Sequence, residues 1–170
     1  MKKRNFLLLL SSALILTVLI LIFWHFQNQG IHLKQINDHL DAGGIQLGML
    51  ESEVIRLWGP GEYLYGMGGH LRDYKDKNIR VGFSDDSDND LYQKVSSLEI
   101  SNSDFSIFSV KVGDDWKAGA DKILSKGFKA VDNSNPIFVN GEYFISITGQ
   151  EKIESIKIWF ADKDLRDRVY

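Results

Sequence analysis

The sequence predicts an α+β fold in which an N-terminal transmembrane helix precedes two related halves, each a helix followed by antiparallel strands. Three observations support this prediction. An uncharged apolar run lies near the N-terminus, each half of the remaining chain contains an amphipathic helical pattern, and alternating apolar runs follow each of those patterns. Packing both helices on one face of a single antiparallel sheet would bury the apolar side of every element.

The composition is that of a globular protein. Of 170 residues, 25% are charged and 44% are hydrophobic, and there are only two prolines. The absence of cysteine excludes a disulfide framework, a thiolate metal site and a catalytic thiol. The net charge of -3, without a basic stripe, argues against nucleic acid as a partner.

Residues 6–26 form the apolar run, and a helix over them would be long enough to cross a bilayer. A cleaved secretory signal is the alternative, but the run ends in aromatic residues without a small-x-small site. Basic residues fill the tail at residues 1–5, which the positive-inside rule places in the cytoplasm. We therefore expect a single-pass protein of the cell membrane, anchored as a signal-anchor, with the C-terminal domain outside the cytoplasm.

Residues 27–44 are expected to contain a juxtamembrane helix. Three apolar residues recur there at helical spacing, namely Leu33, Ile36 and Leu40. A glycine pair ends this pattern. His32 and His39 share one face of the predicted helix, but the sequence places no third ligand beside them, so we interpret both as solvated histidines rather than a metal site.

The extracytoplasmic domain is predicted to occupy residues 45–170, with halves at 45–104 and 105–170. In the first half an apolar stripe from Leu50 to Trp58 predicts a helix, and in the second half a matching stripe runs from Trp116 to Leu124. A glycine follows each stripe. Alternating apolar residues then predict strands in four segments: 79–83, 95–100, 143–147 and 156–160.

The segment from Ile45 to Met49, the Glu53-Val54 pair and the Gly59-Pro60 stop together resemble the repeat of β-lactamase-inhibitor-protein-like domains and small envelope lipoproteins. The resemblance covers residues 45–100 well and 110–160 loosely. It implies helices packed on one face of an antiparallel sheet, and binding of a protein partner without catalysis. A leucine stands at position 50, where a capping serine or threonine is usual.

No motif of a catalytic site is complete, so we expect no enzyme activity and no cofactor. His70 is the one histidine in the segment from 45 onward, and no Gly-x-Ser-x-Gly elbow accompanies it. The glycine-rich stretch before it lacks the lysine and Ser/Thr of a phosphate-binding loop. A hydrolase with His70 as its base is the catalytic alternative.

The segment 59–73 is expected to be a glycine-rich loop that binds a partner. Its candidate contact residues are Tyr63, Tyr65, Met67 and His70, because aromatic side chains and methionine offer contact area together with a polar group. The alternative is a long hairpin loop whose aromatic rings fold back onto the sheet. The acidic stretch 85–90 resembles a calcium loop only in part, since the required glycine and glutamate are missing, and we interpret it as a solvated turn.

These observations predict a membrane-anchored, non-catalytic binding or regulatory module of the bacterial cell envelope, with the membrane bound through residues 6–26 and a protein as its partner. The alternative is an inhibitor or immunity-type protein that blocks a specific enzyme.

Overall fold

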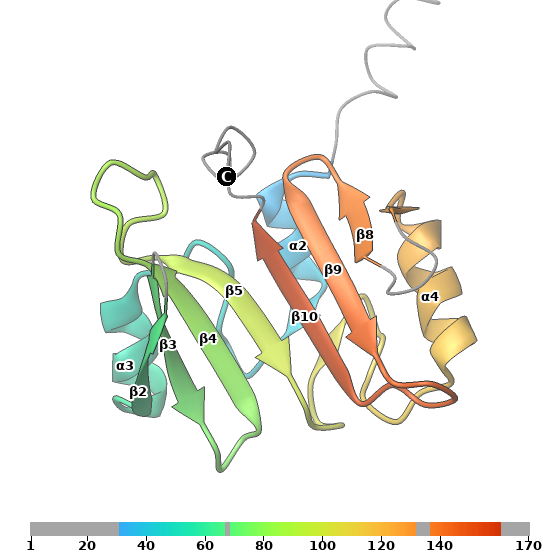
Figure 1. Ribbon diagram of the computed structural model, residues 1–170, viewed down its shortest axis with the longest axis horizontal. Coiled ribbons are helices and arrows are strands. Elements are labelled where there is room, and N and C mark those ends of the chain that lie inside the picture. The colour runs from blue at the N-terminus through green and yellow to red at the C-terminus, as the bar shows by residue number, and fades with distance from the viewer. Residues whose placement is uncertain (1–30, 67–68, 132–136, 161–170) are drawn as a thin grey trace, which may run out of the picture. The chain divides into compact units, whose positions relative to one another are not determined.

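The computed structural model describes residues 31–66, 69–131 and 137–160. Within these ranges the chain forms one compact unit dominated by antiparallel strands (Figure 1). The elements follow in the order α2 (Leu33–Asp38), β1 (Leu40–Asp41), α3 (Glu51–Trp58), β2 (Glu62–Gly66), β3 (Gly69–Tyr74), β4 (Ile79–Ser84), β5 (Val95–Ile100), β6 (Ser106–Ile107), α4 (Trp116–Ser125), β7 (Lys129–Ala130), β8 (Ile137–Asn140), β9 (Tyr143–Thr148) and β10 (Ser155–Phe160).

The main sheet has eight strands in the order β2-β3-β4-β5-β10-β9-β8-β7. Every neighbouring pair is antiparallel, and β5 and β10 pair at its centre from Ile100 opposite Ile156 to Ser97 opposite Trp159. A register shift in the pairing of β4 with β5 leaves Ser96 without a direct partner, as in a β-bulge. A separate two-stranded sheet joins β1 to β6.

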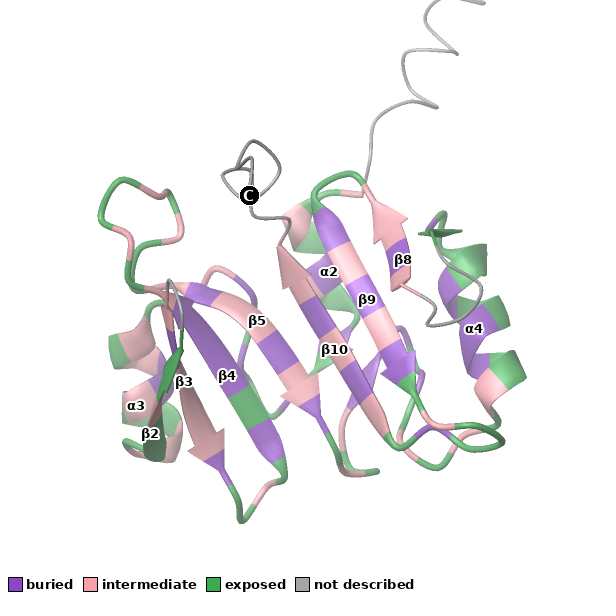
Figure 2. Ribbon diagram, viewed as in Figure 1, coloured by how far each residue is buried: buried purple, intermediate pink, exposed green. Residues whose placement is uncertain are grey.

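The core lies on one face of the main sheet. Buried and half-buried residues alternate along β9 and β10, as expected for strands with one face in the core (Figure 2). Helices α2, α3 and α4 contribute only a few buried residues to this core, namely Ile36, Val54, Gly119, Ala120 and Ile123. Strands therefore supply most of the apolar area that burial stabilises.

Local sequence explains where the two longer helices begin and end. The Glu53 carboxylate accepts a hydrogen bond from the Leu50 N–H at 3.2 Å, and Leu50 has no side-chain oxygen to reciprocate. Helix α3 ends at Gly59, whose φ of 80° suits glycine. Asp115 caps α4 by accepting from the Ala118 N–H at 2.9 Å.

The predicted fold class is wrong in its architecture. The described chain is not two halves of helix packed on sheet, because one continuous antiparallel sheet takes strands from both ends of the domain and the helices have only six, eight and ten residues. The sequence analysis missed β2, β3 and β8, which more than doubles the strands beside each helix when they are added to the sheet's short edge β7.

The prediction of a membrane anchor is also corrected. No helix within the described ranges is long and apolar enough to cross a membrane. The tail at 1–5, the anchor at 6–26 and the first residues of the segment 27–44 lie outside those ranges. The single-pass membrane location and the external placement of the domain depended on that anchor, so neither is retained.

The segment predicted as a juxtamembrane helix differs from the prediction. Helix α2 ends at Asp38 because the next residues turn into β1, where Leu40 pairs with Ile107. Asn37 fixes this segment to the domain: its amide donates to the Leu47 carbonyl and its side-chain oxygen accepts from the Leu47 N–H, both at 3.0 Å. The segment is thus an integral part of the domain.

Candidate functional site

His70 lies at the centre of the candidate site. It is on β3, is only 5% exposed, and its imidazole is stacked between two aromatic rings from the neighbouring strands. The Tyr63 ring of β2 lies 4.7 Å from it at an angle of 19°, and the Phe83 ring of β4 lies 5.2 Å from it at 22°. These contacts fix the plane of the imidazole.

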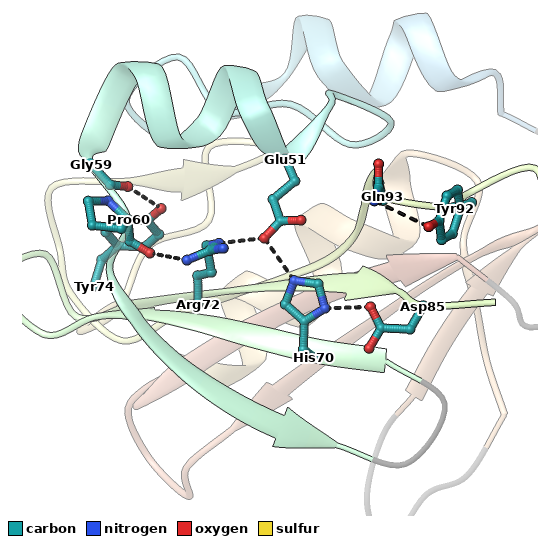
Figure 3. Close-up of polar contacts among 9 residues, drawn as sticks. All are labelled: Glu51, Gly59, Pro60, His70, Arg72, Tyr74, Asp85, Tyr92 and Gln93. Atoms are coloured by element: carbon teal, nitrogen blue, oxygen red, sulfur yellow. Dashed lines mark hydrogen bonds and ion pairs between the residues drawn. The ribbon is translucent and has the colours of Figure 1, made fainter. Parts of the chain in front are cut away.

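Both ring nitrogens of His70 face carboxylates (Figure 3). Nδ1 lies 2.6 Å from Oδ1 of Asp85, and Nε2 lies 2.9 Å from Oε1 of Glu51. An ionised carboxylate only accepts hydrogen bonds, and a neutral imidazole has a single N–H. The protonated imidazolium is the form of His70 that donates to both carboxylates.

Arg72, two residues further along the same face of β3, completes the cluster. Its Nε donates to the same Oε1 of Glu51 at 2.6 Å, and its guanidinium also donates to the Pro60 carbonyl (Figure 3). Two carboxylates thus face two cations, so the charges within the cluster balance. We call Glu51, His70, Arg72 and Asp85 the His70 network.

Two tyrosines of β2 stand in front of this network. Tyr65 is 91% exposed, and Tyr63 is 41% exposed. Their rings meet edge to face at 4.9 Å, and the Arg72 guanidinium lies 5.6 Å from the centre of the Tyr63 ring. Burial against its neighbours raises the pKa of Tyr63, with further contributions from Asp85, Tyr65 and Glu51 that Arg72 partly offsets. Tyr63 and Tyr65 are called the tyrosine surface.

The segment predicted as a flexible recognition loop is mostly the hairpin of β2 and β3. Tyr65 pairs with His70 and Tyr63 with Arg72 in its ladder. Of the four predicted contact residues, Tyr63 and Tyr65 are on the surface, His70 is buried behind them, and Met67 lies outside the described residues. The structure therefore separates one predicted contact residue from solvent.

Three residues of the network escaped the sequence analysis. Arg72 carried a usable signal, because residues two apart on a strand share a face with His70. Glu51 and Asp85 carried none, since their positions depend on how α3 lies over the sheet and how the chain turns after β4.

The described residues contain no group of three side chains placed to hold a metal ion. In the acidic stretch 85–90, side-chain oxygens instead support the turn. Asp86 accepts from the Asp88 N–H at 3.0 Å, and Asn89 accepts from the Leu91 N–H at 2.8 Å. His39 packs against Phe108, with ring centres 5.6 Å apart.

Comparisons with known proteins give a likeness of fold. No family model and no curated protein match the sequence. The chain is similar to a crystal structure of an extracellular protein containing an SCP domain from Bacillus anthracis strain Ames, with a TM-score of 0.52 and 9% sequence identity. The match covers 73% of this chain and 47% of that one, so this chain corresponds to about half of the longer protein.

Proposed function

We propose that the described domain is a non-catalytic protein-binding module and that the tyrosine surface is where its partner binds. The observation that carries this proposal is the exposure of two tyrosines on a regular strand, immediately in front of a buried charged network. Tyrosine is enriched at protein interfaces because its ring offers apolar contact area while its hydroxyl offers a hydrogen bond.

Rigidity of the tyrosine surface supports the proposal. Tyr63 is held by three neighbours at once, the His70 ring, the Arg72 guanidinium and the edge of Tyr65. A side chain that is already fixed loses little conformational entropy when a partner binds, so more of the contact energy remains as affinity. The His70 network thereby has a positioning role behind the contact residues.

The arrangement of His70 argues against catalysis. A histidine base needs a ring nitrogen within reach of the proton that it removes. Both nitrogens of His70 are engaged by carboxylates, and the Tyr63 and Phe83 rings cover its two faces. No position remains for a nucleophile next to the imidazole, which favours binding over the hydrolase alternative.

The charge near the tyrosine surface favours a protein over a nucleic acid. Asp85 borders the network with its side chain half exposed, and Glu62 precedes Tyr63 on the same strand. Carboxylates beside a contact surface repel phosphates, and phosphate neutralisation supplies most of the affinity of nucleic-acid binding.

The test is site-specific photo-cross-linking in producing cells. A photoreactive amino acid replaces Tyr65 in the full chain, and a control chain has the same amino acid at Lys117, an exposed position on α4. We expect a discrete protein adduct from position 65 and none from position 117. The proposal fails if position 65 gives no protein adduct, or if both positions give the same adducts.

A second variant tests whether the contact has the strength of an interface anchor. Tyr63→Ala in the chain labelled at position 65 should reduce the adduct yield, because truncating an anchoring tyrosine costs more than about 1 kcal/mol of binding free energy. An unchanged yield would show that the tyrosine side chains are not what the partner recognises.

A further inference from the structure

The two edges of the main sheet are built differently. The β7 edge has two residues and includes Lys129, so it is short and charged. The β2 edge has five residues, contains neither lysine nor proline, and pairs with β3 without a register shift. Natural proteins usually protect an edge strand with such features, and an edge that lacks them can pair with another strand.

The direction of the backbone groups on β2 follows from contacts across β3 and β4. The Gln93 N–H donates to the Ser84 carbonyl at 3.0 Å, so Ser84 directs its backbone groups away from β3. Gly69 opposite Ser84 is then a non-hydrogen-bonded pair, and His70 opposite Phe83 is the next, hydrogen-bonded pair. His70 therefore directs its backbone N–H and C=O toward β4.

The same alternation fixes the outer edge. Since His70 faces β4, its pair with Tyr65 in the β2–β3 ladder is a non-hydrogen-bonded one. Tyr65 must then direct its N–H and C=O to the open edge, and so must Tyr63, two residues earlier. The tyrosine surface and the free backbone groups of β2 thus belong to the same two residues.

We propose that this edge binds a second copy of the chain by antiparallel pairing of β2 with β2 around a two-fold axis at Leu64. This inference rests on the proposed function, because it names the partner of the tyrosine surface. In this register Tyr63 lies opposite Tyr65 of the second copy, and each of these two equivalent pairs exchanges two backbone hydrogen bonds. An interface of this kind is self-complementary, as a two-fold axis requires.

Charge and side-chain size support the second copy as the occupant. Glu62 lies opposite Gly66 of the second copy, so no like charges meet, and Lys75 already pairs with Glu62. The two Leu64 side chains meet on the sheet face opposite the tyrosines. They would extend a cross-strand row that runs through all eight strands, namely Leu64, Leu71, Gly82, Ser97, Trp159, Phe144, Val139 and Lys129.

The absence of cysteine from the sequence makes a direct test possible. Leu64→Cys in the full chain places two thiols in a non-hydrogen-bonded pair, with Cα atoms about 4.5 Å apart, which a disulfide can bridge. Leu71→Cys is the matched control on the same face, because its two copies would be three strand spacings, about 14 Å, apart. Mild oxidation should produce a disulfide dimer of the first variant and leave the second monomeric.

A second pair of variants separates the backbone from the side chain. Tyr65→Pro in the Leu64→Cys chain removes the outward N–H without touching the β2–β3 ladder. It should reduce cross-linking about tenfold or more relative to Tyr65→Thr, which keeps the N–H, since the symmetric dimer loses two backbone hydrogen bonds at once. Circular dichroism confirms that both variants are folded.

The inference is overturned if Leu64→Cys remains monomeric, if Leu71→Cys cross-links equally, or if the proline and threonine variants behave alike. Its failure is distinguishable from that of the proposed function. A chain that forms no Leu64→Cys dimer but gives an adduct with another protein from position 65 disproves the second copy and leaves the binding surface intact. A chain that gives neither product disproves both.

Discussion

Removing the Glu51 carboxylate should destabilise the domain far more than removing another acid from the same helix turn. Oε1 of Glu51 accepts from two cations at once, Nε2 of His70 at 2.9 Å and Nε of Arg72 at 2.6 Å. The side chains of the three residues are 15%, 4% and 14% exposed, so water cannot replace the carboxylate in Glu51→Ala. Both cations would remain in place with one fewer partner each.

The magnitude follows from these two contacts. A hydrogen bond to a charged group contributes about 1.5–3 kcal/mol, and breaking a buried ion pair costs about 3–5 kcal/mol. His70 keeps Asp85 and Arg72 keeps the Pro60 carbonyl, which offsets part of the loss. We expect Glu51→Ala to lower the free energy of unfolding by about 3 kcal/mol.

The assay is urea denaturation of the full chain followed by far-UV circular dichroism. Glu53→Ala is the matched control, because Glu53 is also in the first turn of α3 and accepts only the Leu50 N–H. Its loss should cost about 1 kcal/mol, the usual value of a helix cap. Equal destabilisation by the two variants would refute the reasoning that the His70 network stabilises this end of the sheet.

Two further perturbations test other parts of the structure. Burial raises the pKa of Tyr74 above 10.0, and its hydroxyl donates to the Gly59 carbonyl at 2.9 Å, so its contribution to stability is full below about pH 10 and is lost as the pH rises through the higher folded-state value. The stability difference between wild type and Tyr74→Phe should therefore shrink above about pH 10 in denaturation curves, and a constant difference would contradict this. Gly119→Ala, normally favourable in a helix, should lower the melting temperature, because the added Cβ would lie 2.5 Å from Cδ1 of Ile153 and 3.1 Å from Cγ1 of Val110, at a cost of about 1–3 kcal/mol; an unchanged or higher melting temperature would show that α4 can move away.

The strands with clear alternation could be located from the sequence. Ile79, Val81 and Phe83 alternate, and β4 buries all three. The β2 strand could not be located in this way, because Tyr63, Leu64 and Tyr65 are all large and show no polar alternation. An edge strand that exposes both faces has no buried face to impose one.

The architecture depended on contacts that a local pattern does not contain. The pairing of β5 with β10 joins Leu98 to Ile158, residues far apart in the chain, and both would be apolar in many other arrangements. The candidate site was predicted in part for the same reason. His70 was recognised as a candidate, but its burial follows from the Tyr63 and Phe83 rings, which reach it from two neighbouring strands.

X-ray hydroxyl-radical footprinting tests the central proposal most directly, by comparing the full chain in producing cells with the purified chain at a concentration too low for association. Tyr65, 91% exposed, should react readily when purified and be strongly protected in cells, whereas Tyr92, 42% exposed and outside the tyrosine surface, should react equally in both. Equal modification of Tyr65 in the two samples would contradict the proposal that a protein occupies this surface.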